Sequence, residues 1–441
     1  MRYPKTARSG SVIRPFWKMK MSQPENKTIL PNRIGIITKN MPHACSVSMG
    51  IWVKAGTRDE SQEENGISHF VEHMLFKGTS KRSAFQIAKE FDAMGGNSNA
   101  FTSMETTCYH TKVITSHVKT ATDLLFDIFL NSLFDTKEIE KERPVIIQEI
   151  GMVEDSPEDY IHLLSGQCFF KNNPLGFSVL GTRSNVTNFK PEKVKEFFEL
   201  LYQPSRIVIS VAGNIEHNNI LDLVGPIIES YKNNTFSPER ITPDVQGGVN
   251  IFEKDLEQVH ICALFKGLPI SDERRYAFSL INTILGGNMS SRLFQEIREK
   301  RGLAYSVYSF ISSYSDTGMF GAFAAVDPEN AFDAADLIIK EIKKIIKHAI
   351  DDQELKDAVE YTKGCLLLAS ESTDNQMFRQ AQNEINFKRH IPLHEITGKI
   401  ESVTKDEVYD LACLLFGSGN LSLTVLGPVP DKSKFMDVLN S

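Results

Sequence analysis

Two histidines and a glutamate in this chain are spaced for metal chemistry. They belong to the pentapeptide His69-Phe70-Val71-Glu72-His73. Residues four apart share one face of a helix, so the imidazoles of His69 and His73 can reach a single Zn²⁺. Glu72 projects beside the same face and can hold a water molecule at the metal. The order is the reverse of H-E-x-x-H, and both are helix-borne zinc motifs, although an amphipathic helix can also carry such a pentapeptide by chance.

A catalytic zinc needs a third protein ligand and an open position for water. Glu149 is the candidate, because it lies in the segment 138–150, whose apolar residues recur with helical spacing. Glu142 lies two turns earlier on nearly the same face and is placed to accept a hydrogen bond from a ligand histidine. On spacing alone, a solvated helix face is the simpler interpretation of both acids. Pro144 is expected to kink this helix just before Glu149.

The surrounding elements mix helices and strands without the steady βαβ alternation of a parallel sheet. The expected elements are a helix capped by Ser83 with Phe85, Ala88 and Phe91 facing inward, a strand over 97–113, and amphipathic helices over 117–134 and 135–154. The sequence therefore predicts an α+β fold in which mixed or antiparallel sheets are covered by helices.

The chain is expected to be a tandem duplication. Residues 47–60 resemble 259–273 and residues 206–213 resemble 420–427, at offsets of 212 to 214 residues. The segment between the two halves is polar and contains prolines and a glycine pair, which is the composition of a linker. The predicted organisation is a basic tail at 1–28, a zinc-binding catalytic α/β sandwich at 29–231, a linker at 232–250 and a homologous sandwich without zinc at 251–441.

Composition excludes several classes of protein. The 441 residues include 49 basic and 56 acidic side chains, giving a net charge of −7, and the basic residues cluster only near the N-terminus. Nucleic acid is therefore not an expected partner. No apolar run reaches the roughly 20 residues that span a bilayer, so no membrane partner is expected. The six cysteines lie far apart, which indicates free thiols in a reducing compartment.

The N-terminal segment is basic enough to resemble an organelle transit peptide. Its first 24 residues hold six basic side chains and no acidic one. However, Pro4, Gly10 and Pro15 interrupt any amphipathic helix, and Met19 or Met21 could be the true start. A disordered or spurious tail is the preferred interpretation. The expected location is cytoplasmic, with the mitochondrial matrix as the alternative.

Five segments distributed over the chain carry a resemblance to a known family. They are GISHFVEHMLFKGT (66–79), GGNSNAFTSMETTCYH (95–110), ERPVIIQE (142–149), NPLGFSVLGT (173–182) and GGNMSSRLFQEIREKRGLAYSV (286–307). In this combination the sequence resembles the pitrilysin/insulinase family of zinc metallopeptidases, in the branch of bacterial peptidases and mitochondrial processing peptidase β subunits. The resemblance runs from about residue 28 to the C-terminus.

The resemblance implies a role for each residue of the first half singled out above. It implies one Zn²⁺ per chain, bound by His69, His73 and Glu149. It further implies Glu72 as the catalytic base and Glu142 as a supporting acid. The expected reaction is peptide hydrolysis by a metal-activated water.

The second half is expected to support this chemistry without binding metal. An offset of 213 puts Asn282, Leu285 and Gly286 at the positions of the two histidines and the base. The resemblance implies that Arg298 and Tyr305 contact the substrate backbone and the oxyanion. A guanidinium and a phenol are suitable donors for charge that develops on an attacked carbonyl oxygen.

The resemblance also implies how peptide and partner bind. The stretch Asn99-Ala100-Phe101-Thr102 matches an edge strand that takes up the substrate as an added strand. The family's clamshell is made of two such chains, so a dimer is expected, either with itself or with a zinc-less homologue. Three acids of one helix could give a preference for basic residues near the cleavage site: Glu192, Glu196 and Glu199.

The sequence thus predicts a zinc-dependent endopeptidase that cuts unstructured peptides or presequences. One alternative is the catalytic subunit of a heterodimeric processing peptidase. Another is a non-catalytic structural subunit like the core proteins of respiratory complexes.

Overall fold

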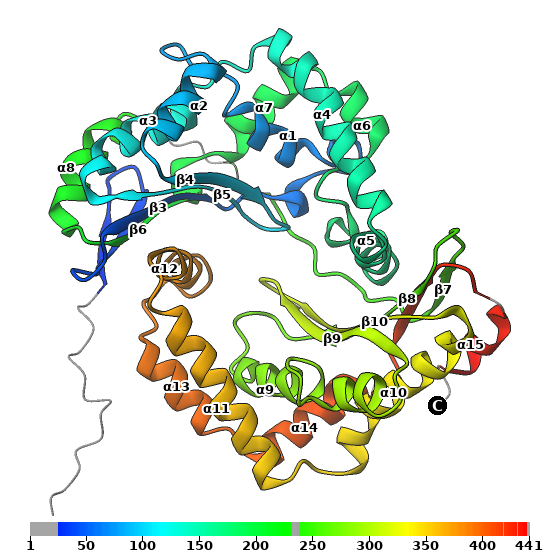
Figure 1. Cartoon of the computed structure of the whole chain (residues 1–441). Coiled ribbons are helices and arrows are strands. Elements are labelled where there is room, and N and C mark those ends of the chain that lie inside the picture. The colour runs from blue at the N-terminus through cyan, green and yellow to red at the C-terminus, as the bar shows by residue number, and fades with distance from the viewer. Residues whose placement is uncertain (1–24, 232–235, 237, 418, 430, 439–441) are drawn as a thin grey trace, which may run out of the picture.

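A computed structural model describes residues 25–231, 236, 238–417, 419–429 and 431–438 of the chain. These residues form two mixed sheets, each covered by helices (Figure 1). The predicted fold, two α/β sandwiches in tandem, is confirmed. Among the described residues, none of the helices combines the length and hydrophobicity needed to traverse a bilayer.

The first sheet of the described chain has six strands in the order β1-β2-β6-β3-β5-β4, with β2 and β6 parallel and the other neighbours antiparallel. Its strands are β1 (Asn26–Ile29), β2 (Gly35–Asn40), β3 (Ser46–Val53), β4 (Asn97–Thr102), β5 (Thr107–Ile114) and β6 (Ile207–Gly213). This order leaves β4 at one edge.

The second sheet has the same order without a counterpart of β1. Five strands of the described chain follow one another as β7-β11-β8-β10-β9, and β7 and β11 are its parallel pair. They are β7 (Gly248–Phe252), β8 (Val259–Gly267), β9 (Ala304–Ser313), β10 (Gly318–Val326) and β11 (Ser422–Leu426). The first pair of repeated segments covers most of β3 and all of β8, and the second pair covers β6 and β11. The strands of each pair occupy equivalent places in the two sheets.

Helices of each half cover the outer face of its own sheet (Figure 1). In the first half they are α1 (Ile67–Met74), α2 (Ala84–Ala93), α3 (Val118–Asn131), α4 (Thr136–Asp155), α6 (Arg183–Asn188), α7 (Pro191–Leu201) and α8 (His217–Ile228). In the second half they are α9 (Arg275–Leu285), α10 (Ala331–Lys347), α11 (Asp352–Ala369), α13 (Leu393–Glu401), α14 (Lys405–Phe416) and α15 (Lys432–Val438).

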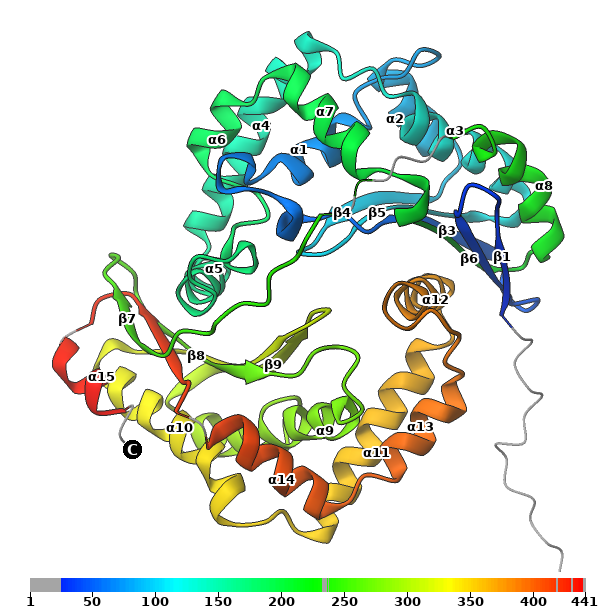
Figure 2. The ribbon, with the colours of Figure 1, turned by 180° about the vertical axis from the view of Figure 1, so that it is seen from behind.

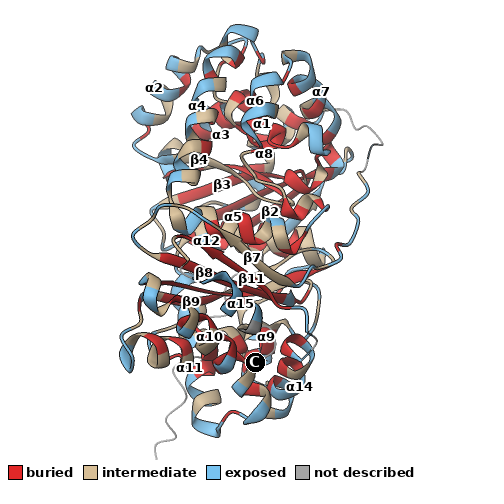
Figure 3. Ribbon diagram, turned by 90° about the vertical axis from the view of Figure 1, so that its right-hand side faces the viewer, coloured by how far each residue is buried: buried red, intermediate tan, exposed pale blue. Residues whose placement is uncertain are grey.

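The inner face of each sheet is covered by a helix of the opposite half. Helix α12 (Thr373–Phe387) of the second half packs on the first sheet, where Met377 lies against Trp52. Helix α5 (Pro157–Phe169) of the first half packs on the second sheet, where Ile161 joins a buried cluster with Phe323. Both helices therefore lie between the sheets (Figures 1 and 2), and Figure 3 shows the buried residues concentrated in these central layers.

Two local expectations from the sequence were wrong. Helix α2 starts after Ser83 and Phe91 packs against the core, both as expected, but Phe85 and Ala88 are exposed and the fully buried residues are Ile87 and Met94. The apolar residues of α2 form two stripes, and only the stripe through Ile87, seven residues before Met94, faces the core.

The expected strand over 97–113 is instead the hairpin of β4 and β5. The chain reverses at Ser103–Thr106, where the amide of Ser103 donates to the carbonyl of Thr106 at 2.8 Å. This turn contains no glycine or proline, so the usual sequence signal for a turn is missing. The boundaries of the tail and linker also differ, because β1 begins at Asn26 and β7 at Gly248. The rest of the predicted tail, and 232–235 and 237 of the linker, lie outside the described residues.

We expect Met377→Ala to lower the free energy of unfolding by about 2–5 kcal/mol, because it opens a cavity between α12 and the first sheet. Leu368→Ala is the control, since Leu368 is 71% exposed on α11 and should change stability by less than about 0.5 kcal/mol. Guanidinium titration followed by tryptophan fluorescence checks this, because Trp52 lies at the contact. Equal effects of the two variants would contradict the packing described for α12.

Candidate metal centre

Helix α1 carries His69, Glu72 and His73, and its start is fixed by a close backbone contact. Gly66 precedes the helix with φ +100°, and a Cβ atom there would lie 2.7 Å from the Cα of Gly181. Only glycine allows both this conformation and this approach. The segment 173–182 therefore contributes to the site by packing against the beginning of α1.

A buried glutamate that the sequence analysis did not single out caps α1. The carboxylate of Glu60 accepts hydrogen bonds from the amides of Gly66 and Ser68, at 2.9 and 2.8 Å, and from Asn65 Nδ2 at 3.0 Å. Burial raises the pKa of Glu60 to about 7 against the opposing effect of these donors. An acid six residues before a helix-starting glycine lies outside the usual capping positions, so local sequence rules do not reveal it.

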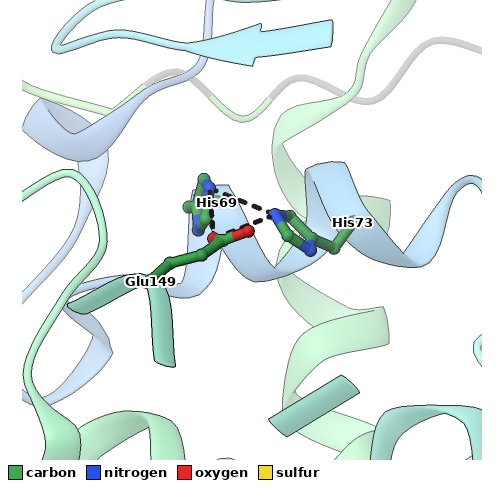
Figure 4. Close-up of side chains that lie close together, drawn as sticks. All are labelled: His69, His73 and Glu149. Atoms are coloured by element: carbon green, nitrogen blue, oxygen red, sulfur yellow. Dashed lines mark hydrogen bonds and ion pairs between the residues drawn. The ribbon is translucent and has the colours of Figure 1, made fainter. Parts of the chain in front are cut away.

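The three predicted ligand side chains converge (Figure 4). The Nε2 atoms of His69 and His73 are 3.2 Å apart, and Oε2 of Glu149 lies 3.7 Å from the first and 3.5 Å from the second. A tetrahedral zinc with bonds of about 2.0–2.1 Å separates its ligand atoms by about 3.3 Å. The two nitrogens and one oxygen therefore fit a zinc ion with one coordination position left open.

Glu142 orients one of the ligand histidines. Its Oε1 lies 2.8 Å from Nδ1 of His73, and its Oε2 lies 2.5 Å from Nζ of Lys77. Burial alone would raise the pKa of Glu142, but the hydrogen bonds from His73 and Lys77 outweigh it and lower the pKa. A carboxylate only accepts, so His73 donates through Nδ1 and its Nε2 carries the lone pair that a metal needs.

His69 is held in its neutral form. Burial, followed by repulsion from His73, lowers the pKa of His69 to about 3. Its Nδ1 is buried and has no hydrogen-bond partner among the described residues. A neutral imidazole is the form that binds a metal, so the environment of His69 favours coordination over protonation.

Glu72 lies on α1 beside the ligands and contacts the edge strand. Thr102 of β4 donates a hydrogen bond to Oε2 of Glu72 at 2.5 Å. Burial raises the pKa of Glu72, with opposing effects from the Thr102 hydrogen bond and the charge of His73. The sequence analysis placed Thr102 on the substrate strand, and the structure adds this direct contact with the proposed base.

Helix α4 supplies Glu142 and Glu149 from one face. Pro144 lies inside this helix, which continues through it to Asp155. The adjacent Arg143 donates to the backbone carbonyls of Val186 and Phe189, which ties this turn to the segment around α6. The proline therefore does not end the helix before the ligand.

The predicted substrate strand is an open edge of the first sheet. Residues 99–102 pair with β5 on one side only. Phe101 packs edge-on against Trp52, while the amide of Ala100 is bonded to the side chain of Asn99 at 2.9 Å. An added strand would have to displace that local bond.

The equivalent helix of the second half cannot form such a site. In α9, Asn282 accepts a hydrogen bond from Ser309 of β9 at 2.8 Å, and a Cβ atom on Gly286 would lie 2.3 Å from the backbone of Ser309. The buried residue Leu285 takes the place of the base. Helix α9 therefore packs closely on β9, at the place where α1 carries the candidate ligands.

Arg298 and Tyr305 lie together in the second half. The guanidinium of Arg298 is 4.8 Å from the ring centroid of Tyr305, and the Tyr305 side chain is 80% exposed. No contact joins either residue to the metal ligands among the residues described. Three further acids point to solvent from α7: Glu192, Glu196 and Glu199.

Family models match most of the chain. Residues 35–183 match the insulinase family of peptidases, M16, and residues 188–361 match the M16 inactive domain. The uncharacterized zinc protease YmxG of Bacillus subtilis is 40% identical over 90% of this chain and 97% of its own. The chain belongs to the insulinase family of peptidases.

Other relatives agree with this assignment. An uncharacterized zinc protease of Streptomyces coelicolor is 38% identical over 92% of this chain and 90% of its own. The crystal structure of a protease from Helicobacter pylori has the same fold, with a TM-score of 0.85 at 20% identity, covering 92% of this chain and 99% of that protein.

We expect Glu142→Gln to lower zinc affinity about 10- to 100-fold, because the amide no longer fixes the orientation and basicity of His73. Glu138→Gln is the matched control on the same helix, since Glu138 contacts Lys141 at the surface. Competition with a chromophoric chelator measures both affinities. An unchanged affinity in Glu142→Gln would show that this hydrogen bond does not support the ligand.

We expect stability to depend on pH through Glu60. Because burial raises its pKa in the folded chain to about 7 from the ordinary 4.5, its contribution is complete below pH 4.5 and is lost as the pH rises to 7. The difference in Tm between wild type and Glu60→Gln, both metal-free, should therefore fall from pH 5 to pH 8. A difference that stays constant or grows with pH would contradict this assignment.

Proposed function

We propose that this chain is a zinc-dependent endopeptidase that hydrolyses unstructured peptides or presequences. The observation that carries the proposal is the convergence of His69, His73 and Glu149 at separations of 3.2 to 3.7 Å. Membership of a peptidase family and relatives named zinc proteases support it. Zinc bound at these residues, one per chain, would polarise the scissile carbonyl and make water a stronger acid.

Glu72 acts as the general base in this proposal. It accepts a proton from the attacking water and delivers it to the leaving amine. The hydrogen bond from Thr102 occupies Oε2, whereas no described residue is bonded to Oε1. Burial raises the pKa of Glu72 above its ordinary value, which makes its carboxylate a stronger base.

The peptide binds along β4 as an added strand. Residues 99–102 provide an open edge, and Thr102 connects that edge to the base. Recognition through main-chain hydrogen bonds requires an extended substrate and tolerates many sequences. This geometry favours unstructured peptides over folded proteins.

Arg298 and Tyr305 stabilise the oxyanion in an assembled dimer. Their mutual contact presents a guanidinium and an exposed phenol from one surface of the second half. Since they do not contact the described ligands of their own site, a second chain is needed to enclose the substrate. We propose a homodimer, and the alternative is a heterodimer with a zinc-less homologue, which would appear as a second chain at equal stoichiometry. A cytoplasmic location stays a prediction.

The structural-subunit alternative has less support. A scaffold does not require a buried glutamate beside a neutral histidine, or an acid that is hydrogen-bonded to a second histidine. Zinc content without peptidase activity in the assembled protein would favour this alternative.

We expect Glu72→Gln to keep one zinc per chain and to lose about 10²- to 10⁴-fold in kcat, because the general base is removed while the ligands remain. Glu138→Gln, on the surface of α4 where Glu138 contacts Lys141, should keep the wild-type rate. Cleavage of a quenched-fluorescent unstructured peptide and zinc analysis check both variants, with oligomeric state verified. If wild type bound no zinc and cut nothing, the peptidase proposal would fail.

A further inference from the structure

A cavity of about 530 Å³ lies where the two halves meet. Its walls come from the β4–β5 turn, the end of β9, the linker and the C-terminal part of α12. We call it the junction cavity and define it by Lys54, Ser103, Arg240, Tyr314 and Asn386. The linker that carries Arg240 passes between the two halves in Figure 2.

Three carboxylates near this cavity are already paired with arginines. Asp59 binds both Arg206 and Arg240, with distances of 2.9 to 3.1 Å. Glu105 and Asp316 each bind Arg58 at 2.7 Å. These pairs connect the tip of the β4–β5 hairpin, the linker and the β9–β10 turn.

Two neighbouring lysines have no acidic partner among the described residues: Lys54, in the wall of the junction cavity, and Lys388, next to Lys54. Lys54 follows β3 and is half-buried, and Lys388 ends α12. Neither ammonium group donates to an acceptor or pairs with an acid of a described residue, and the two ammonium groups are close enough to repel each other. The carbonyls at the end of α12 offer only about half an elementary charge. The three arginines are balanced by the three carboxylates. The two lysines add two positive charges that no described carboxylate neutralises.

Burial and the neighbouring cations oppose the charged form of Lys54. Desolvation, then Lys388, Arg206 and Arg240, lower the pKa of Lys54 to about 7. An anion in the cavity would remove this penalty, so the site is prepared for negative charge.

We propose that the junction cavity binds an oxyanion, a carboxylate or phosphate group, through Lys54 and Lys388. Ser103 lines the cavity and directly follows Thr102 in the chain. The hydroxyl of Thr102 contacts Glu72. A peptide that pairs parallel to β4 and extends past Thr102 would bring its C-terminal carboxylate toward this cavity, and a free phosphate compound could enter the same cavity. The peptide source rests on the proposed function, whereas the phosphate source does not.

The first experiment compares thermal unfolding in sodium chloride and sodium phosphate at equal ionic strength and pH 6.5. We expect phosphate to raise the Tm of the wild type by about 2–4 °C at saturation. Lys54→Met and Lys388→Met should abolish the rise. Lys89→Met, at an exposed position of α2, should keep it.

The second experiment uses Glu72→Gln, which binds peptide without cutting it. Calorimetry compares one unstructured peptide with a free C-terminal carboxylate and its C-terminal amide. We expect the carboxylate form to bind about tenfold more tightly, the effect of one charge-assisted hydrogen bond. Adding Lys54→Met should remove the difference.

The two experiments distinguish a peptide carboxylate from a free phosphate as the ligand. They also distinguish failure of the oxyanion proposal from failure of the proposed peptidase function. A response to phosphate alone identifies a free oxyanion as ligand, and a preference for the carboxylate alone identifies the peptide. The phosphate response needs no turnover, so it stands even if neither peptide binds and the proposed function fails. No response in either experiment, or responses that persist in both lysine variants, would overturn the proposal.

Misfolding of the lysine variants can be recognised. Without phosphate, Lys54→Met should unfold at the wild-type temperature or above it, because it loses a repelled charge. If it instead unfolds earlier, Lys388→Met decides, since Lys388 is exposed and its replacement disturbs no buried contact.

Discussion

The exchange of one helix between the two halves is the constraint on which the rest of the structure depends. A sheet has two faces, and the other helices of the same half cover only the outer one. The inner face of the first sheet is buried by α12 and that of the second by α5. Separating the halves would expose two apolar clusters at once, so they are held in one arrangement. That arrangement also brings the β4–β5 turn and the β9–β10 turn to the linker.

The candidate metal centre depends on burial as much as on ligand identity. The pKa of His69 is lowered and the pKa of Glu72 is raised by the same physical cause, removal from water. Burial disfavours the charged form of both side chains, and for His69 the neutral form is the one that binds a metal. Glu142 differs because hydrogen bonds from His73 and Lys77 keep it ionised. One small region thus holds two carboxyl groups with opposite pKa shifts, an arrangement typical of functional sites.

The duplication shows how one fold carries two different sets of side chains. Helices α1 and α9 take equivalent places on their sheets, but α9 packs on β9 through Gly286 and Ser309, with no room for larger side chains. In the first half, the corresponding space is filled by imidazoles and by the acids of α4. The second half keeps an exposed aromatic and a guanidinium on a neighbouring surface. The sheet order is therefore retained while the side chains diverge.

The sequence by itself determined that His69 and His73 share one face of a helix as candidate ligands, because four-residue spacing on a helix is local geometry. It also determined the duplication and the mixed fold class, which follow from repeated segments and element order. Tertiary structure decided what local periodicity cannot: which stripe of α2 is buried, and where the 97–113 segment turns. It also decided that Glu60, far from the usual capping position, closes the start of α1. These contacts join residues whose meeting depends on how whole elements pack, and no window of sequence contains that information.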